Sequence, residues 1–177
     1  ELVIIKSRSN ANGWVVGSSL SPNVEDYMWL HLTSAWLPGS FWNNTRPTAT
    51  EFSVSTGAAV NGSGLNFIAY LFSSLDGVSK VGTYAGTGGT VNVDCGFSAG
   101  ARFILIKRTD STGDWYVWDS ERGIVAGNDP YLLLNSTAAE VTSTDYIDPL
   151  SSGFTVTSSA PAALNASGGT YIFLAIA

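Results

Sequence analysis

Four acidic residues form the densest group of carboxylates in the 177-residue chain and are the first candidates for catalysis. They are Asp110, Asp114, Asp119 and Glu121. Two carboxyl groups about 5–9 Å apart can hydrolyse a glycosidic bond by general acid and base catalysis. The alternative is structural. In that interpretation the first two acids flank a polar turn, and the last two pair with Arg122 or Lys107.

Other side chains could hold a metal ion or act as a nucleophile. Asp110 with Asp114, or Asn128 with Asp129, could offer oxygen atoms to Ca²⁺, but no segment has the Asp-x-Asp-x-Asp-Gly spacing of a calcium loop. The single cysteine, Cys95, allows no internal disulfide and no cysteine metal cluster, and is expected to be a buried thiol. We therefore predict no metal and no cofactor.

A nucleophilic site has equally little support. No serine or cysteine stands in a Gly-x-Ser-x-Gly context. His31 lies between two leucines, which favours a structural role in an apolar strand. The sequence therefore predicts that the chain is not an enzyme.

Aromatic residues gather in one stretch of the first half, among Pro, Gly and Asn residues that favour a loop. The predicted ligand-binding residues are Trp29, Trp36, Phe41 and Trp42, together with Tyr131 in the second half. Sugars stack on exposed aromatic rings, and loops on a rigid β-scaffold commonly carry binding residues. The alternative is that these rings are buried in the core or in an interface between subunits.

The composition excludes two classes of partner. Only 12% of the residues are charged, against about 25% in an average protein, and the net charge is −6. Such a surface has no attraction for a phosphate backbone, so nucleic acid is not expected as a partner. No apolar run reaches the ~18 residues of a membrane span, and no signal peptide is recognisable, so we expect no membrane insertion.

The chain repeats itself. Residues 2–6, followed by Trp14, recur as residues 103–107 and Trp115, at an offset of 101. Further matches carry the offset to 104, and one of them aligns Trp29 with Tyr131. Such self-similarity predicts two copies of one unit, which we place at 1–76 and 77–177, packed together as one body.

Strand signals dominate both copies, as β-branched and aromatic runs bounded by turn residues. The predicted strands are 2–6, 13–18, 28–33, 51–55 and 65–72, then 79–84, 90–94, 102–108, 114–119, 130–135, 153–157 and 170–176. This spacing predicts an all-β fold, a β-sandwich or jelly roll of two repeats related by an approximate pseudo-twofold axis.

Two features add detail to this fold. Four apolar runs form the predicted core: 2–5, 67–72, 103–106 and 171–176. Residues 80–96 are predicted to form a hairpin that turns at 86–89 and has no counterpart in the first copy. Because the chain opens on Glu1 in a strand-like run, we expect a cut or processed N-terminus.

Several segments carry a resemblance to a known family. They are Ile-Lys-Arg-Thr-Asp-Ser-Thr-Gly-Asp-Trp at 106–115, Asn-Ser-Thr-Ala-Ala-Glu at 135–140, Asp-Pro-Leu-Ser-Ser-Gly-Phe at 148–154, and Asn-Ala-Ser-Gly-Gly-Thr-Tyr-Ile-Phe-Leu-Ala at 165–175. In this order they resemble a domain of unknown function in virion proteins of tailed phages, especially marine and cyanobacterial ones. The resemblance covers 79–177 well, while 6–13 fits a related variant and 20–50 departs from it. No catalytic residue comes with this family.

The resemblance implies a tail fibre or related appendage, commonly a homotrimer, on the surface of the virion. Together with the residues, it predicts a non-enzymatic domain that forms oligomers, contacts other virion proteins and adheres to a host-surface glycan or protein. Two alternatives stay open. One is a capsid decoration or head-fibre domain, and the other is a glycan depolymerase that uses the acidic residues.

Overall fold

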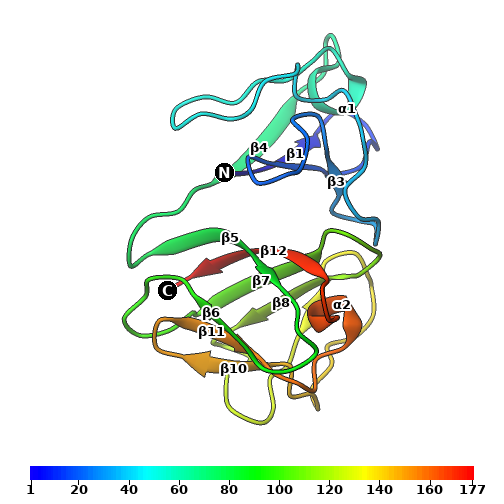
Figure 1. The fold of residues 1–177 in the computed structure, drawn as a ribbon. Coiled ribbons are helices and arrows are strands. Elements are labelled where there is room, and N and C mark those ends of the chain that lie inside the picture. The colour runs from blue at the N-terminus through cyan, green and yellow to red at the C-terminus, as the bar shows by residue number, and fades with distance from the viewer. The chain divides into compact units, whose positions relative to one another are not determined.

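The computed structural model describes the whole chain, Glu1–Ala177, as two compact units, Glu1–Ser73 and Ser74–Ala177 (Figure 1). We call them unit 1 and unit 2 and describe each by itself. All strand pairs are antiparallel, and the only helices are two single turns, α1 (Ala58–Asn61) and α2 (Ala162–Asn165). The prediction of an all-β chain is confirmed, while the jelly-roll arrangement of two symmetric repeats stays a prediction.

Unit 1 is built on one sheet with the strand order β3-β2-β1-β4. Its strands are β1 (Leu2–Ser7), β2 (Val15–Ser18), β3 (Met28–Trp29) and β4 (Phe67–Phe72). Alternate apolar residues of β1 and β2 share one face of this sheet, because side chains alternate along a strand. On that face Val3, Ile5 and Val15 pack with Trp42 from the long loop and Val60 from α1.

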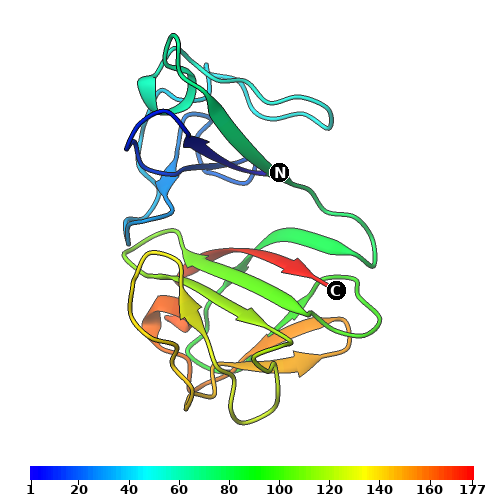
Figure 2. The ribbon, with the colours of Figure 1, turned by 180° about the vertical axis from the view of Figure 1, so that it is seen from behind.

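Unit 2 has two sheets. The larger sheet has the order β5-β12-β7-β8-β9, and the smaller has the order β10-β11-β6. The strands are β5 (Ser79–Ala85), β6 (Val91–Asp94), β7 (Phe103–Arg108), β8 (Trp115–Asp119), β9 (Leu132–Leu133), β10 (Ile147–Leu150), β11 (Gly153–Val156) and β12 (Thr170–Ile176). The orange strands β10 and β11 lie side by side in the view from behind (Figure 2).

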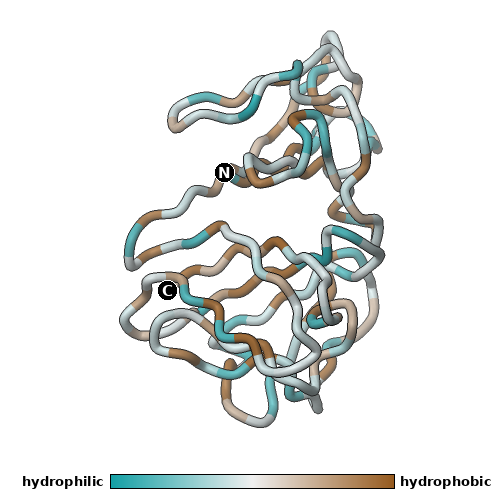
Figure 3. The backbone as a smooth tube through the Cα atoms, viewed as in Figure 1, coloured by the Kyte–Doolittle hydropathy of each residue, from teal (hydrophilic) through white to brown (hydrophobic).

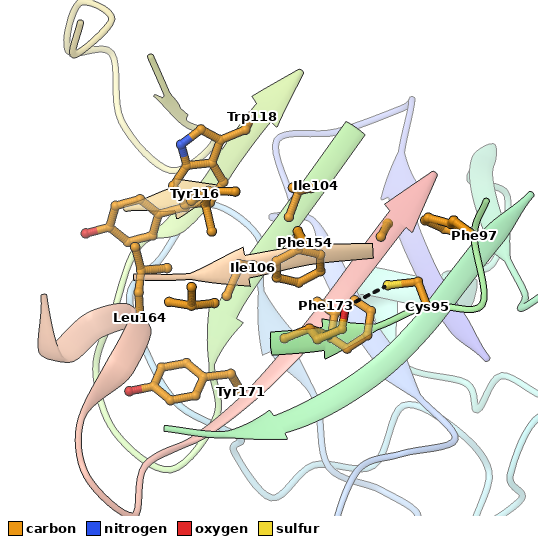
Figure 4. Close-up of a cluster of buried hydrophobic side chains, with 14 residues drawn as sticks. Cys95, Phe97, Ile104, Ile106, Tyr116, Trp118, Phe154, Leu164, Tyr171 and Phe173 are labelled. Carbon is orange, nitrogen blue, oxygen red and sulfur yellow. Dashed lines mark hydrogen bonds between the residues drawn. The ribbon is translucent and has the colours of Figure 1, made fainter. Parts of the chain in front are cut away.

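One hydrophobic core joins the two sheets of unit 2. Ile104, Ile106 and Phe173 come from the larger sheet, and Phe154 and Val93 come from the smaller one. Figure 4 shows how closely these side chains gather, with Leu164 of α2 at one end and Cys95 and Phe97 at the other. The tube coloured by hydropathy shows the same concentration of apolar residues along the central strands of unit 2 (Figure 3).

The two units share a pattern of strands. The order β3-β2-β1-β4 in unit 1 matches β9-β8-β7-β12 in unit 2. The register matches too, because adding 101 to both members of the Leu2–Ser18 pair gives the observed Phe103–Asp119 pair. For residues after β2, corresponding residues of the two units differ by 104 in number, as the bridges Tyr27–Leu37 and Tyr131–Val141 show. Trp29 therefore corresponds to Leu133, and the sequence alignment of Trp29 with Tyr131 is wrong by two residues.

The predicted strand at 51–55 is absent, and residues 51–55 have no regular structure. The corresponding strand β11 in unit 2 is paired on both sides, with β6 and β10. In unit 1 no strand lies on either side of residues 51–55 to pair with them. Phe52 and Val54 still contact the core of unit 1. β10 was missed because its sequence, Ile-Asp-Pro-Leu, contains a proline, which argues against a central strand but is tolerated at a sheet edge.

The predicted hairpin at 80–96 does not form. β5 pairs with β12 and β6 pairs with β11, so the chain crosses from one sheet to the other between them. Asn165 holds this crossing. Its Oδ1 accepts hydrogen bonds from the backbone N–H of Thr87 (3.0 Å) and Gly88 (3.3 Å), and its Nδ2 donates to the carbonyl oxygens of Gly89 and Thr157. The turn residues at 86–89 are typical of a hairpin, but the hydrogen bonds of the buried Asn165 side chain hold this segment as a crossing between the two sheets.

Three of the four apolar runs predicted as core are buried, and the fourth is not. Residues 2–5, 104–106 and 171–175 are buried, while the four central residues of β4 are exposed. The physical reason is pairing: β12 is covered by β5 on its outer edge, whereas β4 pairs with β1 alone.

Asn165→Ala should destabilise the chain strongly, because it leaves three backbone groups around residues 87–89 without their partner. We expect a loss of about 2–4 kcal/mol in the free energy of unfolding of the Asn165→Ala variant. The measurement is chemical denaturation followed by circular dichroism. The matched control is Asn61→Ala, at the corresponding but exposed position of α1, which should cost under about 1 kcal/mol. Equal losses for the two variants would contradict the role of Asn165.

Candidate aromatic binding site

Five aromatic residues of unit 1 lie on one segment, Tyr27–Arg46, which includes β3 and which we call the aromatic loop. It leaves the sheet after β3 and returns beside it, because Tyr27 and Leu37 exchange backbone hydrogen bonds of 3.0 and 2.9 Å. This bridge closes residues 27–37 into a loop whose two ends both lie at the sheet. The rings on the loop are therefore carried by backbone that is fixed at both ends.

Edge-to-face contacts connect four rings of the aromatic loop, those of Tyr27, Trp29, His31 and Phe41. The ring centroid of Tyr27 lies 4.7 Å from that of Phe41 and 5.3 Å from that of Trp29, and both pairs are nearly perpendicular. Trp29 also contacts Phe41 at 6.0 Å and His31 at 5.4 Å. Such pairs are favoured by the charge distribution of aromatic rings and add about 0.5–1.5 kcal/mol each beyond burial. The network therefore behaves as one rigid group.

A carboxylate holds the far side of the loop. Glu25 Oε2 accepts a hydrogen bond from the backbone N–H of Trp42 (2.9 Å), and Oε1 accepts one from the N–H of Asn44. Asn43 and Asn44 both have positive φ, 52° and 49°, a conformation that asparagine tolerates better than most residues. The tight turn that the two asparagines make points the N–H groups at Glu25.

Two further groups fix the same segment. The guanidinium of Arg46 donates to the carbonyl oxygens of Ser19 and Ser21, each at 2.9 Å. The indole N–H of Trp42 donates to the carbonyl oxygen of Asp26 at 3.1 Å. Trp42 is only 3% exposed and covers Gly17, where an added Cβ would lie 2.2 Å from the ring. Trp42 is therefore a core residue that supports the loop.

The structure brings four of the five predicted site residues into unit 1 and separates the fifth. Trp29, Trp36 and Phe41 are half-buried, so each keeps some surface in contact with solvent. Tyr131 lies in unit 2, where it is half-buried and its ring packs against Tyr116 at 5.1 Å, beside the core of that unit. Tyr131 thus acts as the counterpart of Tyr27 and supports its own unit.

Sequence reasoning missed two residues of this site. His31 is exposed, not buried in a strand, because β3 ends at Trp29. Its ring lies over Gly13, where an added Cβ would be 2.1 Å away. The corresponding pair in unit 2 is Asp114 and Asn135, whose side chains are joined by a 2.6 Å hydrogen bond. Glu25, the other residue, could have been found from its counterpart 104 residues later, Asp129.

Asp129 performs in unit 2 the task of Glu25 in unit 1. Its carboxylate accepts hydrogen bonds from the backbone N–H of Tyr146 (2.9 Å) and Ile147 (3.1 Å), and Tyr146 lies 104 residues after Trp42. Asp129 is fully buried, and burial raises the pKa of its carboxyl to about 6, although the two backbone N–H groups act in the opposite direction. The nearby indole N–H of Trp118 also lowers this pKa.

Two of the four acidic residues first considered for catalysis pair with arginines. Asp110 pairs with Arg108 (3.0 Å), which holds the pKa of Asp110 below its usual value, and Asp119 pairs with Arg122. Lys107 pairs with neither Asp119 nor Glu121. It is buried, its ammonium donates to the carbonyl oxygen of Arg108 at 2.7 Å, and burial lowers its pKa to about 8.

The structure shows neither a cluster of metal-ligating side chains nor an activated thiol. No group of three or more His, Cys, Asp and Glu side chains could hold a metal ion. Cys95 is buried, and that burial, with the nearby carboxylate of Asp94, raises the pKa of the thiol to about 11. A thiol with so high a pKa is a poor nucleophile. None of the helices is long and apolar enough to cross a membrane.

Residues 1–177 match the family described as Domain of unknown function (DUF7483). The chain belongs to this family. The match spans both units, so the pattern of strands that they share lies within one DUF7483 domain. No curated protein and no solved structure matches the chain.

The buried carboxyl of Asp129 makes the stability of this DUF7483 chain depend on pH. Its pKa is about 6 in the folded chain and about 3.9 when unfolded, so the folded state binds the proton more tightly. This contribution is fully present below about pH 4 and is lost as the pH rises through about 6, up to about 3 kcal/mol. The measurement is the free energy of unfolding between pH 4 and pH 7.

The control for this prediction is Asp129→Asn, which cannot titrate. The difference in stability between the wild-type chain and this variant should fall as the pH rises from 4 to 7. A difference that stays constant over this range would contradict the raised pKa, whatever its absolute size.

Proposed function

We propose that this chain is a non-catalytic virion domain of a tailed phage that adheres to a host-surface glycan through the aromatic loop of unit 1. One observation carries the proposal. Trp29 and Trp36 keep part of their rings in solvent, with the exposed His31 beside Trp29, on a loop whose backbone is held by Glu25 and Arg46. A preorganised aromatic surface binds with little loss of conformational entropy.

The surroundings of the rings suit a neutral sugar. Ser40, Asn43, Asn44 and Thr45 are exposed on the same loop and offer hydroxyl and amide groups. An apolar ring face with polar groups at its edge is the arrangement that sugars require, because their C–H faces stack while their hydroxyls form hydrogen bonds. With so few charged residues in the chain, a neutral glycan is a better partner than a strongly anionic one.

Unit 2 supports the proposal by contrast. Where unit 1 has Trp29 and His31, unit 2 has Leu133 and Asn135, and Asn135 is occupied by hydrogen bonds to Asp114 and to the backbone N–H of Trp115. We infer that the units are copies of one module, of which unit 2 kept the complete core and unit 1 specialised its loop. Repetition in an assembled appendage would raise avidity without new contacts.

The virion location rests on the resemblance to phage appendage domains. The depolymerase alternative is weaker, because Asp110 and Asp119 pair with arginines, and the pKa of Asp110 is lowered by Arg108, which does not suit a general acid. A capsid decoration or head-fibre role, with another virion protein as partner, gains support from the exposed apolar residues of β4.

The test is adsorption of the purified, labelled chain to candidate host cells, with polysaccharide from the same cells as soluble competitor. We expect saturable binding that the polysaccharide blocks. Trp36→Ala and His31→Ala should each weaken adsorption about tenfold, which corresponds to about 1.4 kcal/mol. Neither substitution removes a residue of the core cluster, so both variants should stay folded.

Val125→Ala is the matched control, since Val125 is exposed on unit 2 and should not affect binding. Saturable adsorption that neither substitution in the aromatic loop reduces would contradict the proposed site. No adsorption by a chain shown to be folded would contradict the adhesive function and favour the decoration role.

A further inference from the structure

Strand β4 leaves one edge of the sheet in unit 1 open. It pairs with β1 along its whole length and with no other strand. Its sequence, Phe-Ile-Ala-Tyr-Leu-Phe, has no charge, no proline and no glycine. Ile68, Tyr70 and Leu71 are 37%, 43% and 59% exposed. A long, uncharged apolar edge of this kind lacks the devices by which proteins prevent strand pairing between molecules.

Unit 2 shows what such an edge accepts. β12 occupies the place of β4 in the shared strand order, and its outer edge is covered by β5 over seven paired residues, from Thr170–Ala85 to Ile176–Ser79. Phe173 of β12 lies against Gly82 of β5. The corresponding residue of β4 is Ala69, so an incoming strand would find room there for a side chain.

The outward backbone groups of β4 can be assigned from its pairing with β1. The N–H of Arg8 donates to the carbonyl oxygen of Asn66, so even-numbered residues of this strand direct their backbone groups toward β1. Phe67, Ala69 and Leu71 then direct their N–H and C=O groups outward. These groups form the row to which another antiparallel strand would bond.

We propose that the partner on this edge is a second copy of the chain, and that two β4 strands pair antiparallel about a twofold axis near Ala69. A twofold pairing aligns odd-numbered residues with odd-numbered ones, so the outward groups of both strands meet. It places Phe67 opposite the partner's Leu71 and Ile68 opposite the partner's Tyr70. All four are apolar, so the strand is complementary to itself.

This pairing has a defined assembly state. An isologous contact uses the same surface on both copies and closes at two, so the chain should be a dimer, or a larger assembly made of such dimers. The proposal rests on β4 alone and requires no glycan. It would therefore stand if the adhesive function failed, and the reverse also holds.

Sedimentation equilibrium on the full chain tests the pairing. We expect a monomer–dimer equilibrium that Leu71→Lys weakens at least tenfold, because it places a charge in the apolar row. Leu75→Lys is the control, since Leu75 is 60% exposed but lies outside β4. Ala69→Pro is a second variant, which removes an outward N–H without removing a hydrogen bond to β1 and should weaken the dimer similarly. Circular dichroism would establish that each variant is folded.

Three outcomes would overturn the proposal. One is a dimer that neither Leu71→Lys nor Ala69→Pro weakens, and another is a trimer. The third is a chain that stays monomeric at about 100 μM.

Discussion

In each unit, one acidic side chain connects a long loop to the residues just before a short strand, β3 in unit 1 and β9 in unit 2. Glu25 accepts the N–H groups of Trp42 and Asn44, and Asp129 accepts those of Tyr146 and Ile147. In each unit the carboxylate holds the backbone N–H of an aromatic residue, Trp42 in unit 1 and Tyr146 in unit 2. A buried carboxylate such as that of Asp129 is costly unless it is satisfied by hydrogen bonds, which explains why unit 2 directs backbone N–H groups at it.

The units differ in what completes their cores. In unit 2 a second sheet supplies Val93, Phe154 and Val156. Unit 1 has no second sheet, and Trp42, Phe41 and Phe52 from its loops take that place. A core made of loop aromatics leaves ring surface near solvent. The open edge of β4 has a separate origin, because the strand that covers the corresponding edge of β12 is β5 of the larger sheet, and β4 has no such neighbour.

The sequence predicted the β class and most strands, because alternating apolar residues and turn residues report local structure directly. It failed where a distant partner decides. Residues 51–55 have strand composition but no neighbour to pair with, and 80–96 resembles a hairpin but is drawn into two sheets, held by Asn165. Among the predicted site residues, composition could not separate the buried Trp42 from the half-exposed Trp36. Glu25 was visible only through its offset from Asp129.

Glu25 holds the aromatic loop in the form that we propose binds a glycan. The most direct measurement compares the wild-type chain with Glu25→Ala in two ways, by hydrogen exchange at the amides of Trp42 and Asn44 and by affinity for the polysaccharide that competes with adsorption. We expect faster exchange at both amides and weaker binding in the variant. Faster exchange with unchanged affinity would contradict the role of Glu25 in binding.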